Sequence, residues 1–555
     1  MTKKAWKLRT SSGISLRDQL LAGRGVAAEE QAFFLMPDYA LAIHDPFLLT
    51  DMAVAVERLL RAIDSGERLA VFADYDADGV PAAALLVSFF RKIGFNNFEV
   101  YIPDRHEENH GLSDVAIRGL ADRGVKLIVT LDCGIANAES VATAATWGVE
   151  IIITDHHLIP ASGWPTAAVA VVDPKRDLGK YPSPDLCGAG VAFKLVQALI
   201  ARGNFNLPTG WEKWLLDLVA IATVSDMVPL VGENRALVRY GLIVLRKSPR
   251  AGVQALCRVL NLTQESLSED DIAFSLGPRI NAASRMAHGS QALELLTTTD
   301  LARARALAEE LERYNKQRRV LVDRILLATE SVDESSPVVV AGDAGWSLGV
   351  LGLAASRLVE KFERPVFLWG QNSQGLIKGS CRSDGSVGVV DLMEAAGGAD
   401  YFFNHGGHLH AGGFALAAER VAELPVRLQT AYQAVPKQLV ESELWLDAEL
   451  SLMEVDEVVY AHVEALAPFG MNNPKPVFLF SGVPISTLRI MKGGLHLELG
   501  LPGRHGLLSA FSFFNSFPEL GLRSGDRIDL AATIEKSYFR RYPELRLRIV
   551  DLRRS

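Results

Sequence analysis

The sequence has few cysteines and no long hydrophobic run. Only four of its 555 residues are cysteine, they lie far apart, and none forms a CxxC pair: Cys133, Cys187, Cys257 and Cys381. Scattered thiols are typical of a reduced, cytoplasmic protein. No segment approaches the roughly 18–20 uninterrupted apolar residues of a transmembrane helix, and the start, MTKKAWKLRTSSG, has no apolar secretory segment. We therefore expect a cytoplasmic protein with no membrane partner.

The composition is that of an ordinary globular chain. Hydrophobic residues make up 49% and charged residues 22% of the sequence, which excludes wholesale disorder, collagen-like repeats and low complexity. At about 100–200 residues per domain, the length predicts three or four domains. The formal net charge is −9, and this acidity argues at first against a nucleic-acid partner.

The net charge is unevenly distributed along the chain. Residues 481–555 contain 12 basic and 7 acidic side chains, a net of +5, whereas the remaining 480 residues carry a net of −14. A basic C-terminal module on an acidic body differs from a uniformly acidic protein. The basic module is either a solvated face or a surface for an anionic partner, and charge alone does not distinguish the two.

The first half of the chain predicts a helical segment followed by a parallel sheet. Residues 1–68 have apolar positions at helical spacing, and we expect them to pack as helices on the domain that follows, residues 69–298. In that domain short apolar runs alternate with helical stretches, as in a parallel sheet buried on both faces. The predicted strands lie at 69–73, 98–102, 126–131, 149–154 and 168–172.

The second half predicts a long helix, a smaller α/β domain and an all-β module. Residues 299–332 are rich in helix formers and charge and contain neither Gly nor Pro, which favours one long helix that bridges two domains. Residues 333–435 form the second α/β unit, rich in glycine. Residues 436–555 contain short strands at near-regular spacing, which is typical of a small barrel or sandwich.

Acidic residues follow the predicted strands of the first sheet, where ligands bind in such sheets. Four of these strands are followed directly by an aspartate, and the first turn, DYDADG, contains two more: Asp74, Asp132, Asp155 and Asp173, with Asp76 and Asp78. Carboxylates at i, i+2 and i+4 repel one another unless cations lie between them. The alternatives are an Asp-rich surface turn or a calcium loop, but no EF-hand glutamate follows.

Two adjacent histidines, His156 and His157, follow Asp155, and Asp226 follows a later helical stretch. A single histidine is more often a satisfied core residue, but here the pair shares a sheet edge with several carboxylates. Mixed Asp and His ligands suit Mn²⁺ or Mg²⁺ better than a thiolate zinc site. A carboxylate such as Asp132 can bridge two ions, and two ions about 3.5–4 Å apart can catalyse phosphoryl transfer.

The motifs DYDADG, LDCG, TDHH and VSDMVPL, in that order, resemble those of the DHH phosphoesterase superfamily. Within it, the chain is similar to the RecJ family of single-strand-specific 5′→3′ DNA exonucleases. Matching segments span most of the chain: IPDRHEENHGLS (102–113), GPRINAASRM (277–286), GVLGLAASRLVEKFERPVFL (349–368), GSCRS (379–383), GGHLHAGGFAL (406–416) and PFGMNNPKPVF (468–478). The resemblance implies a DHH domain, the long helix, a DHHA1 domain and a C-terminal OB-fold.

The resemblance also implies roles for individual residues. The metal ligands would be Asp74, Asp76, Asp78, Asp132, His156 and Asp226. Asp155 would orient a ligating histidine. The residues implied at the reacting phosphate are Asp132, His157, Arg279 and His408, with Asn281 beside the DNA. Arg105, Ser380 and Arg382 match positions that hold the 5′-terminal phosphate, for which the arginine fork is well shaped.

Some positions depart from the family pattern. Ala73 precedes the first motif where the family commonly has glycine, Val80-Pro81 follow it, and Trp346-Ser347 stand where a Trp-His pair is usual. The residues that follow GSCRS also differ from the family pattern. None of these positions is an implied metal ligand, so we expect the activity to be retained.

The basic C-terminal module gains a function from the resemblance, because OB-folds bind single strands through basic grooves and aromatic platforms. We expect the alternating Phe511 and Phe513 to point into the core of this module. The cluster between Tyr538 and Tyr542 is predicted to meet the DNA. The implied DNA-binding residues are Lys536, Tyr538, Arg540 and Arg541.

The leading hypothesis is a 5′→3′ exonuclease of DNA repair and recombination that releases 5′-mononucleotides from single-stranded DNA with two Mn²⁺ or Mg²⁺ ions. Single-strand-binding protein and a repair helicase are the implied partners, and a monomer is expected. One alternative is a phosphodiesterase for short RNA or cyclic dinucleotides, although such relatives lack the basic barrel. The other is a non-catalytic DNA-binding scaffold, against which the retained Asp and His residues argue.

Overall fold

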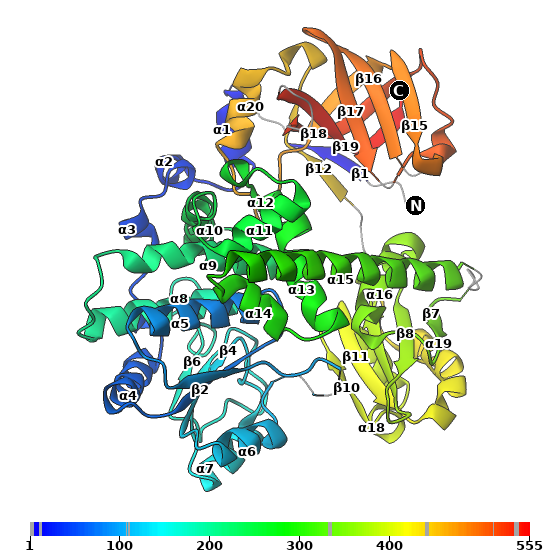
Figure 1. Cartoon of the computed structure of the whole chain (residues 1–555). Helices are drawn as coiled ribbons and strands as arrows, with labels where there is room; N and C mark the ends of the chain where they lie inside the picture. Colours follow the sequence, from blue (N-terminus) through cyan, green and yellow to red (C-terminus); the bar gives the residue numbers. More distant parts are fainter. Residues whose placement is uncertain are drawn as a thin grey trace. The chain divides into compact units, whose positions relative to one another are not determined.

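The computed structural model describes residues 5–9, 14–106, 108, 111–330, 336–438, 443–494, 496–513, 515–537 and 543–555. The chain divides into two compact units. One contains His44–Val228 and Leu237–Val440, and the other contains Thr2–Ile43, Pro229–Ala236 and Glu441–Ser555. The first unit holds both α/β domains, as Figure 1 shows in blue to yellow.

The first domain is built on a five-stranded parallel sheet in the order β3-β2-β4-β5-β6. The predicted parallel sheet is therefore confirmed. Strands β2, β4 and β5 are almost wholly buried and apolar, because helices cover both of their faces. The strands are β2 Leu69–Ala73, β3 Phe98–Tyr101, β4 Leu127–Leu131, β5 Glu150–Thr154 and β6 Ala170–Val172.

The helices around this sheet cover both of its faces, and Figure 1 shows α5 and α8 above the strands and α6 and α7 below them. Alternate strand residues such as Phe72, Ile128 and Ile153 pack towards α6 and α7. The opposite face carries α4, α5 and α8. The helices are α4 Met52–Ser65, α5 Gly79–Lys92, α6 Asp114–Asp122, α7 Ala138–Thr146 and α8 Gly188–Arg202.

A helical subdomain completes the first domain and leads into the long helix. A π-helical turn, Ile272–Leu276, runs directly into α13, which carries the GPRINAASRM motif. The helices are α9 Leu216–Ser225, α10 Gly232–Leu245, α11 Ala251–Leu260, α12 Glu269–Asp271, α13 Gly277–Met286 and α14 Ser290–Thr297. Helix α15, Leu301–Ala328, is capped by the Asp300 side chain and confirms the predicted long helix.

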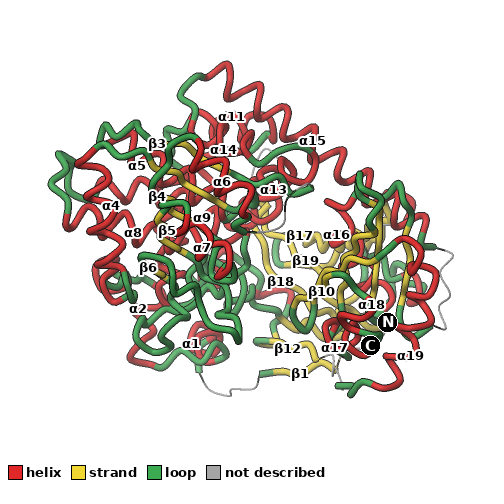
Figure 2. Tube along the Cα trace, turned by 90° about the horizontal axis from the view of Figure 1, so that it is seen from below, coloured by secondary structure: helices red, strands yellow, loops and turns green. Residues whose placement is uncertain are grey.

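The second α/β domain has a five-stranded mixed sheet in the order β10-β11-β9-β8-β7. Helix α16 packs with α15 on one face of this sheet, and α17 and α19 cover the other. Figure 2 colours strands yellow and labels β10 of this sheet. The elements are β7 Val339–Gly342, α16 Leu348–Phe362, β8 Val366–Gln371, β9 Ile377–Arg382, α17 Val389–Ala395, α18 Gly398–Tyr401, β10 Asn404–Gly407, β11 Ala411–Leu416 and α19 Leu424–Ala434.

The second unit is a strand-rich OB-type module whose seven strands follow the order β13-β14-β18-β19-β17-β16-β15. Its core is apolar and includes Phe478, Phe480 and Leu547. The elements are β12 Glu443–Leu446, β13 Ala448–Glu449, α20 Glu457–Glu464, β14 Phe478–Pro484, β15 Thr487–Met491, β16 His496–Gly503, β17 Gly506–Phe513, β18 Arg527–Ser537 and β19 Glu544–Arg554.

The N-terminal segment differs from the prediction. Residues 1–68 were expected to be helical and to pack on the first α/β domain, but Ala5–Leu8 form strand β1, which pairs in parallel with β12. The short helices α1 Leu16–Ala22, α2 Gln31–Leu35 and α3 Tyr39–Ala42 also belong to the C-terminal unit. Only α4 fits the prediction. Helical periodicity in one stretch does not reveal which distant strand a neighbouring stretch joins.

No single helix in the described part of the chain has the length and apolar character needed to cross a membrane. One pair, Tyr39–Leu48 with Met52–Ser65, meets these criteria together but is bent by 78°.

Candidate metal centre and phosphate-binding residues

The register of the first sheet brings its acidic strand ends together. Ala73, Leu131 and Thr154 are direct partners on neighbouring strands, so the residues that follow them are Asp74, Asp132 and Asp155. The ladder continues for one more step, because Asp74 N donates to Leu131 O and Asp132 N donates to Thr154 O, at 3.2 and 3.0 Å. The three carboxylates therefore start from one edge of the sheet, as the sequence predicts.

Asp132 has an unusual backbone conformation. Its φ is 62°, in the left-handed region, which for a non-glycine residue costs on the order of 1–3 kcal/mol and is concentrated at functional sites. Helix α8 passes so close that a Cβ on Gly188 would lie 2.5 Å from the Cβ of Asp132. Asp132 is thus confined between a strained strand end and a helix start that tolerates only glycine.

The DYDADG turn is held by backbone donors. Asp76 Oδ1 accepts from the N–H groups of Asp78 and Gly79 at 2.8 and 3.2 Å. Asp78 in turn accepts from Gly188 N and Ala189 N at 2.6 and 2.7 Å. These two amides form the N-terminus of α8, where the helix dipole favours a negative charge. The turn therefore presents its carboxylates in one fixed arrangement.

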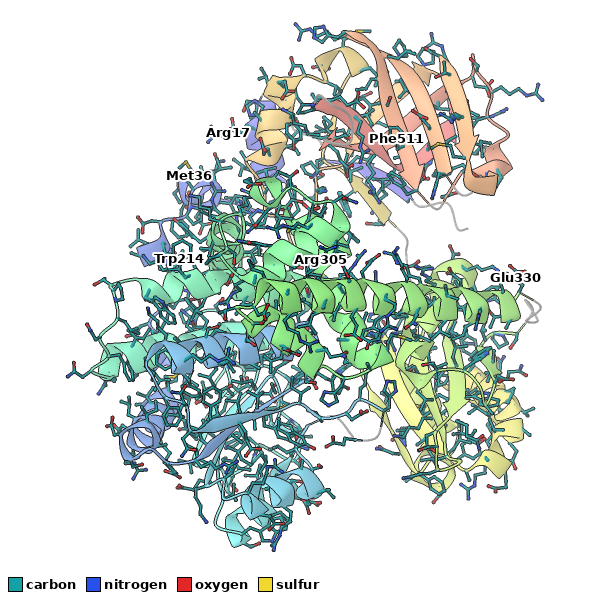
Figure 3. All side chains as sticks on the ribbon, viewed as in Figure 1. Arg17, Met36, Trp214, Arg305, Glu330 and Phe511 are labelled. Atoms are coloured by element: carbon teal, nitrogen blue, oxygen red, sulfur yellow. The ribbon has the colours of Figure 1, made fainter. Side chains whose placement is uncertain are left out.

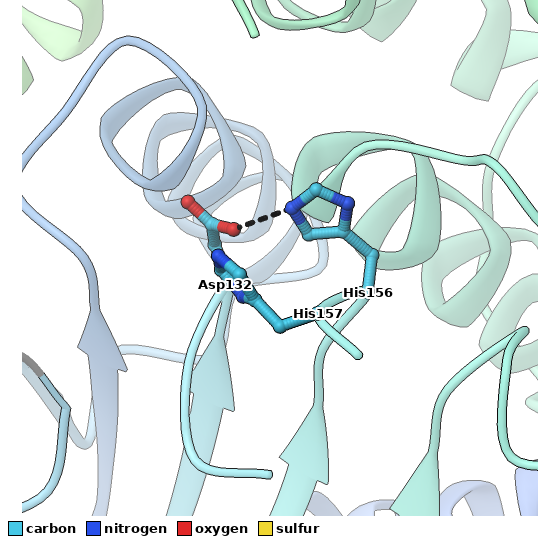
Figure 4. Close-up of side chains that lie close together, drawn as sticks. All are labelled: Asp132, His156 and His157. Carbon is cyan, nitrogen blue, oxygen red and sulfur yellow. Dashed lines mark ion pairs between the residues drawn. The ribbon is translucent and has the colours of Figure 1, made fainter. Parts of the chain in front are cut away.

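His156 lies among three carboxylates, of which Figure 4 shows Asp132. Its Nε2 is 3.1 Å from Asp132 Oδ1, 3.6 Å from Asp78 Oδ2 and 3.7 Å from Asp226 Oδ2. Three groups of potential ligands result, each with its ligand atoms within 4.8 Å of one another: Asp74, Asp76 and Asp132; Asp78, His156 and Asp226; and Asp132, His156 and His157. All six predicted metal ligands are brought together, and Asp132 belongs to two groups, as a bridging ligand would.

These residues fit divalent cations. Asp132 Oδ1 is buried and has no hydrogen-bond partner among the described residues, so it has an oxygen lone pair to give to an ion. Burial, reinforced by neighbouring carboxylates, raises the pKa of Asp78 to about 7 and that of Asp226 to about 8, and raises that of Asp132 well above its usual value. Without a cation the cluster therefore retains protons. Bound cations would offset the repulsion between the ionised carboxylates.

The two histidines are tuned in opposite directions. Burial, followed by the charge of His157, lowers the pKa of His156 to about 4, which leaves the neutral imidazole that a metal requires. Burial also disfavours charge on His157, but its Nδ1 lies 2.7 Å from Asp155 Oδ1, and this hydrogen bond raises the pKa of His157 to about 9. His157 is therefore a cation that faces solvent beside the cluster.

Asp155, the residue predicted to orient a ligating histidine, accepts hydrogen bonds from both histidines. It is buried and accepts from Ile135 N at 2.9 Å and from His156 N at 2.7 Å, in addition to the His157 imidazole. Burial alone would raise the pKa of Asp155, but the hydrogen bond to His157 lowers it to about 2. The carboxylate is thus permanently ionised and fixes the geometry of the turn.

Arg279 and Asn281 are both anchored on α13. Asn281 Oδ1 accepts from Ala77 N at 3.0 Å and so contacts the DYDADG turn. Arg279 is buried, donates to Glu312 Oε2 at 2.9 Å, and also donates to two carbonyl oxygens of the preceding turn. The guanidinium of Arg279 therefore has protein partners already, which the sequence did not indicate.

The predicted 5′-phosphate residues come from both α/β domains. The Arg105 guanidinium lies over the Tyr75 ring at 4.7 Å. Ser380 and Arg382 lie on β9 of the second domain, and the charge of Arg105 acts on Arg382. His408 is exposed and lies at the β10–β11 connection, where His408 N donates to Ala411 O at 2.8 Å.

Two features of the centre were missed by the sequence reasoning. The Lys175 ammonium donates to His156 O and so anchors the ligand-bearing turn, and α8 supplies the amides that hold Asp78. Lys175 follows the strand-end aspartate Asp173 by two positions, and the Gly-Ala-Gly run at 188–190 is typical of a close approach. Both signals lie in the sequence but become meaningful only when the distant segments are juxtaposed.

The OB-type module corrects one prediction. Phe511 and Phe513 do not point into the core: Ala510 and Ser512 are buried, whereas Phe511 is partly exposed and Phe513 is 36% exposed. Their rings stack at 6.3 Å with an interplanar angle of 13°. Figure 3 marks Phe511 on this sheet. The alternation that suggested a core face is real, but it is the small residues between them that face inwards.

Basic side chains flank these rings. The Arg546 guanidinium lies 5.5 Å from the Phe511 ring, and that of Arg548 lies 5.0 Å from the Phe513 ring. Lys536 forms an ion pair with Glu457 at 2.9 Å. The predicted DNA-binding residues Tyr538, Arg540 and Arg541 lie outside the described residues.

Three protein-family models match the chain. They are the DHH family, N-terminal domain, over residues 68–223; the DHHA1 domain over residues 335–434; and the RecJ OB domain over residues 446–551.

Curated relatives and solved structures agree with these matches. The single-stranded-DNA-specific exonuclease RecJ of Haemophilus influenzae is 30% identical over 529 residues, which cover 91% of each chain. That of Escherichia coli is 34% identical over 451 residues, 78% of each chain. The crystal structure of RecJ with Mn²⁺ from Thermus thermophilus has a TM-score of 0.82 at 28% identity and covers 99% of this chain and 80% of that one.

We predict that Gly188→Ala disrupts the centre whereas Gly190→Ala does not. A Cβ at Gly188 would meet the Asp132 side chain at 2.5–2.8 Å, whereas at Gly190 its nearest neighbour would lie 3.4 Å away. Displacing a ligand in this way typically costs about 10–100-fold in metal affinity. Calorimetric Mn²⁺ titration of both variants, with circular dichroism to confirm folding, measures the difference. Equal affinities in the two variants would contradict the close packing of α8 on Asp132.

We also predict that Asp132→Asn raises the melting temperature of the metal-free protein at pH 8. The pKa of Asp132 is raised on folding. As the pH rises above the pKa that Asp132 has in the unfolded chain, its ionisation therefore opposes folding increasingly. If the substitution relieves about 1 kcal/mol of repulsion, the melting temperature should rise by roughly 2–4 °C.

Scanning calorimetry with and without Mn²⁺ tests this prediction. Wild type should be stabilised by Mn²⁺, whereas Asp132→Asn should be more stable than wild type without the ion and respond weakly to it. A variant that melts lower than wild type without metal would show that Asp132 stabilises the fold instead.

Proposed function

The chain belongs to the RecJ family of single-stranded-DNA-specific exonucleases, and we propose that it removes nucleotides one at a time from the 5′ end of single-stranded DNA with two divalent cations. The observation that carries this proposal is the cluster around Asp132, in which five carboxylates and His156 converge at one sheet edge. Structures of the Thermus thermophilus relative contain Mn²⁺ or Mg²⁺.

The ligand groups divide naturally between two ions. Asp74, Asp76 and Asp132 would hold one, and Asp78, His156 and Asp226 would hold the other. Asp132 Oδ1 lies 3.1 Å from His156 Nε2, so we assign Asp132 to both ions. When bound, two such ions activate a water molecule for attack on phosphorus and offset the charge on the leaving oxygen. The phosphorus–oxygen bond to the 3′ oxygen of the terminal nucleotide breaks, and the shortened strand keeps a 5′-phosphate.

His157 supplies a positive charge beside the ions. Asp155 lies 2.7 Å from its Nδ1 and keeps the ring charged at neutral pH, so the imidazolium would attract a phosphate oxygen. Such a preorganised cation stabilises charge that develops during reaction without reorganisation. His408 and Asn281 are proposed to contact the DNA on the other side of the reacting phosphate, as the family resemblance implies.

We assign the direction of digestion to Arg105, Ser380 and Arg382. Two of these residues are arginines from different domains, and they lie close enough for one charge to act on the other. Two guanidinium groups and a hydroxyl suit the terminal phosphate monoester better than an internal diester, because the monoester offers more oxygens and more charge. Each cleavage regenerates that 5′-phosphate for the next cycle.

The stacked rings of the OB-type module are proposed as a platform for the downstream strand. Bases of any sequence can stack on Phe511 and Phe513, beside the Arg546 and Arg548 guanidinium groups.

We also propose that the chain works as a monomer, because all metal and 5′-phosphate groups come from one chain. A cytoplasmic location is supported by four buried free cysteines.

The direct test is digestion of single-stranded DNA labelled at either end, with Mn²⁺. Wild type should release labelled mononucleotide from the 5′-labelled strand at once and shorten the 3′-labelled strand stepwise. Asp132→Ala should reduce the rate by at least about 1,000-fold, on the scale of other essential catalytic groups.

Asp122→Ala is the matched control, because Asp122 is an exposed aspartate on α6 in a surface pair with Arg118, and it should cut like wild type. Failure of wild type to release mononucleotides with either metal, or full activity in Asp132→Ala, would refute the proposed function.

A second prediction concerns the aromatic platform. Replacing both Phe511 and Phe513 by alanine should weaken metal-free binding of a long oligothymidylate by at least about tenfold, since base stacking contributes about 1–3 kcal/mol per ring. Leu507→Ala is the control, because Leu507 is 61% exposed on the same strand. Fluorescence anisotropy measures the affinity. If the double variant binds as tightly as Leu507→Ala, the platform is not the binding surface.

A further inference from the structure

Three polar side chains on α13 and α15 have no part in the metal centre or in the proposed 5′-phosphate residues. They are Arg285 on α13 and Asn315 and Arg318 on α15. Helices α13, α15 and α16 pack against one another in the first unit. Arg318 Nη2 donates to Asn315 Oδ1 at 2.9 Å, and Arg285 Nη1 donates to Gly349 O in the first turn of α16 at 2.8 Å.

Two donors in this cluster have no acceptor. Asn315 is completely buried, yet its Nδ2 has no hydrogen-bond partner among the described residues, and the same is true of the buried Nε of Arg318. Buried donors in folded proteins are nearly always satisfied, so each exception calls for an explanation. Two orphaned N–H donors three residues apart on α15 suit an oxygen-rich ligand.

The positive charges in the cluster are not compensated. Within the described part of the chain, neither Arg285 nor Arg318 has a carboxylate at ion-pair distance, although nearby arginines do: Arg279 pairs with Glu312, Arg313 with Glu310 and Arg357 with Asp323. Burial, and then the charges of Arg105 and Arg318, lower the pKa of Arg285 to about 9. Like charges gathered in this way favour an anion between them.

The cluster is placed between two parts of the proposed site. Arg285 is close enough for the charges of Asp76, in the metal centre, and of Arg105 to act on it. Arg105 in turn lies over Tyr75, the neighbour of Asp76. An anion held by Arg285 and Arg318 would therefore lie beside the nucleotide that is being removed.

A purely structural role explains these contacts less well. Arginines that only join helices usually satisfy their donors with carboxylates or several carbonyls, as Arg235 does with four carbonyl groups of the C-terminal unit, those of Phe34, Leu466, Ala467 and Pro468. Among the residues that the structure describes, Arg285 donates to a single carbonyl and Arg318 to a single amide oxygen. The remaining donors of both groups stay available for a ligand.

We propose that Arg285, Asn315 and Arg318 form a second phosphate-binding subsite, which takes a phosphate group of the DNA strand next to the metal centre. The proposal rests on the proposed function for the identity of the strand. The phosphate comes either from the 5′ terminus or from an internal diester, and both present the same oxygens to the guanidinium forks.

The first test uses inorganic phosphate and metal-free protein, so it does not depend on nuclease activity. Phosphate should raise the melting temperature of wild type, and Arg318→Gln should lose more than half of that shift. Without phosphate, Arg318→Gln should melt no lower than wild type, because an uncompensated charge has been removed. A lower melting temperature without phosphate, or an undiminished shift, would overturn the proposal.

Asn315→Asp provides a second variant of the same shape. The new carboxylate would pair with Arg318 and compete with phosphate, so the variant should fold stably and lose the phosphate response. Arg313→Gln is the control, because Arg313 lies on the same helix and is 55% exposed in its side chain, and its shift should equal that of wild type. A normal phosphate response in Asn315→Asp would contradict the subsite.

The second test compares digestion of 5′-phosphorylated and 5′-hydroxyl oligonucleotides. Arg318→Gln should raise KM at least fivefold. A rise confined to the phosphorylated strand assigns the subsite to the terminal phosphate, and an equal rise for both assigns it to an internal diester. If wild type cuts DNA and Arg318→Gln has unchanged kinetics, the subsite is refuted while the proposed function stands. If wild type cuts nothing but responds to phosphate through Arg318, the proposed function is refuted while the subsite stands.

Discussion

Mutual repulsion among buried carboxylates is the constraint on which the rest of this structure depends. Five aspartates lie within reach of one another, and burial and proximity raise the pKa of at least three of them. Such an arrangement costs folding free energy unless cations enter it. The fold meets that cost with a parallel sheet whose central strands are buried and whose register fixes three of the strand ends, and with the N-terminus of α8, whose amides hold Asp78.

Positively charged side chains surround the carboxylate cluster. Some of the cations are already paired, such as His157 with Asp155 and Arg279 with Glu312. Others, namely Arg285 and Arg318, have no carboxylate at ion-pair distance among the described residues. A DNA strand supplies one negative charge per phosphate, so it complements the unpaired arginines while the metal ions complement the aspartates. The net negative charge of the chain is therefore compatible with DNA binding, because the aspartates and the unpaired arginines occupy different positions.

Much of this organisation follows from the sequence. Apolar runs that end in aspartate predict both the parallel sheet and the place of the ligands, and a long stretch free of Gly and Pro predicts α15. Three features required the structure. The segment Ala5–Leu8 becomes a strand only because it pairs with β12, 438 positions away in register. Phe511 and Phe513 face outwards because the small residues between them fill the core. The partner of Arg279 lies on another helix, and no local pattern indicates it.

The central claim is that Asp132 joins two metal ions, and electron paramagnetic resonance of the Mn²⁺-loaded protein tests it most directly. Two Mn²⁺ ions that share a carboxylate are magnetically coupled, so the account predicts two equivalents per chain with the spectrum of a coupled pair. In Asp132→Asn the coupled spectrum should be lost. One equivalent per chain, or two ions with the spectrum of isolated Mn²⁺, would contradict the account.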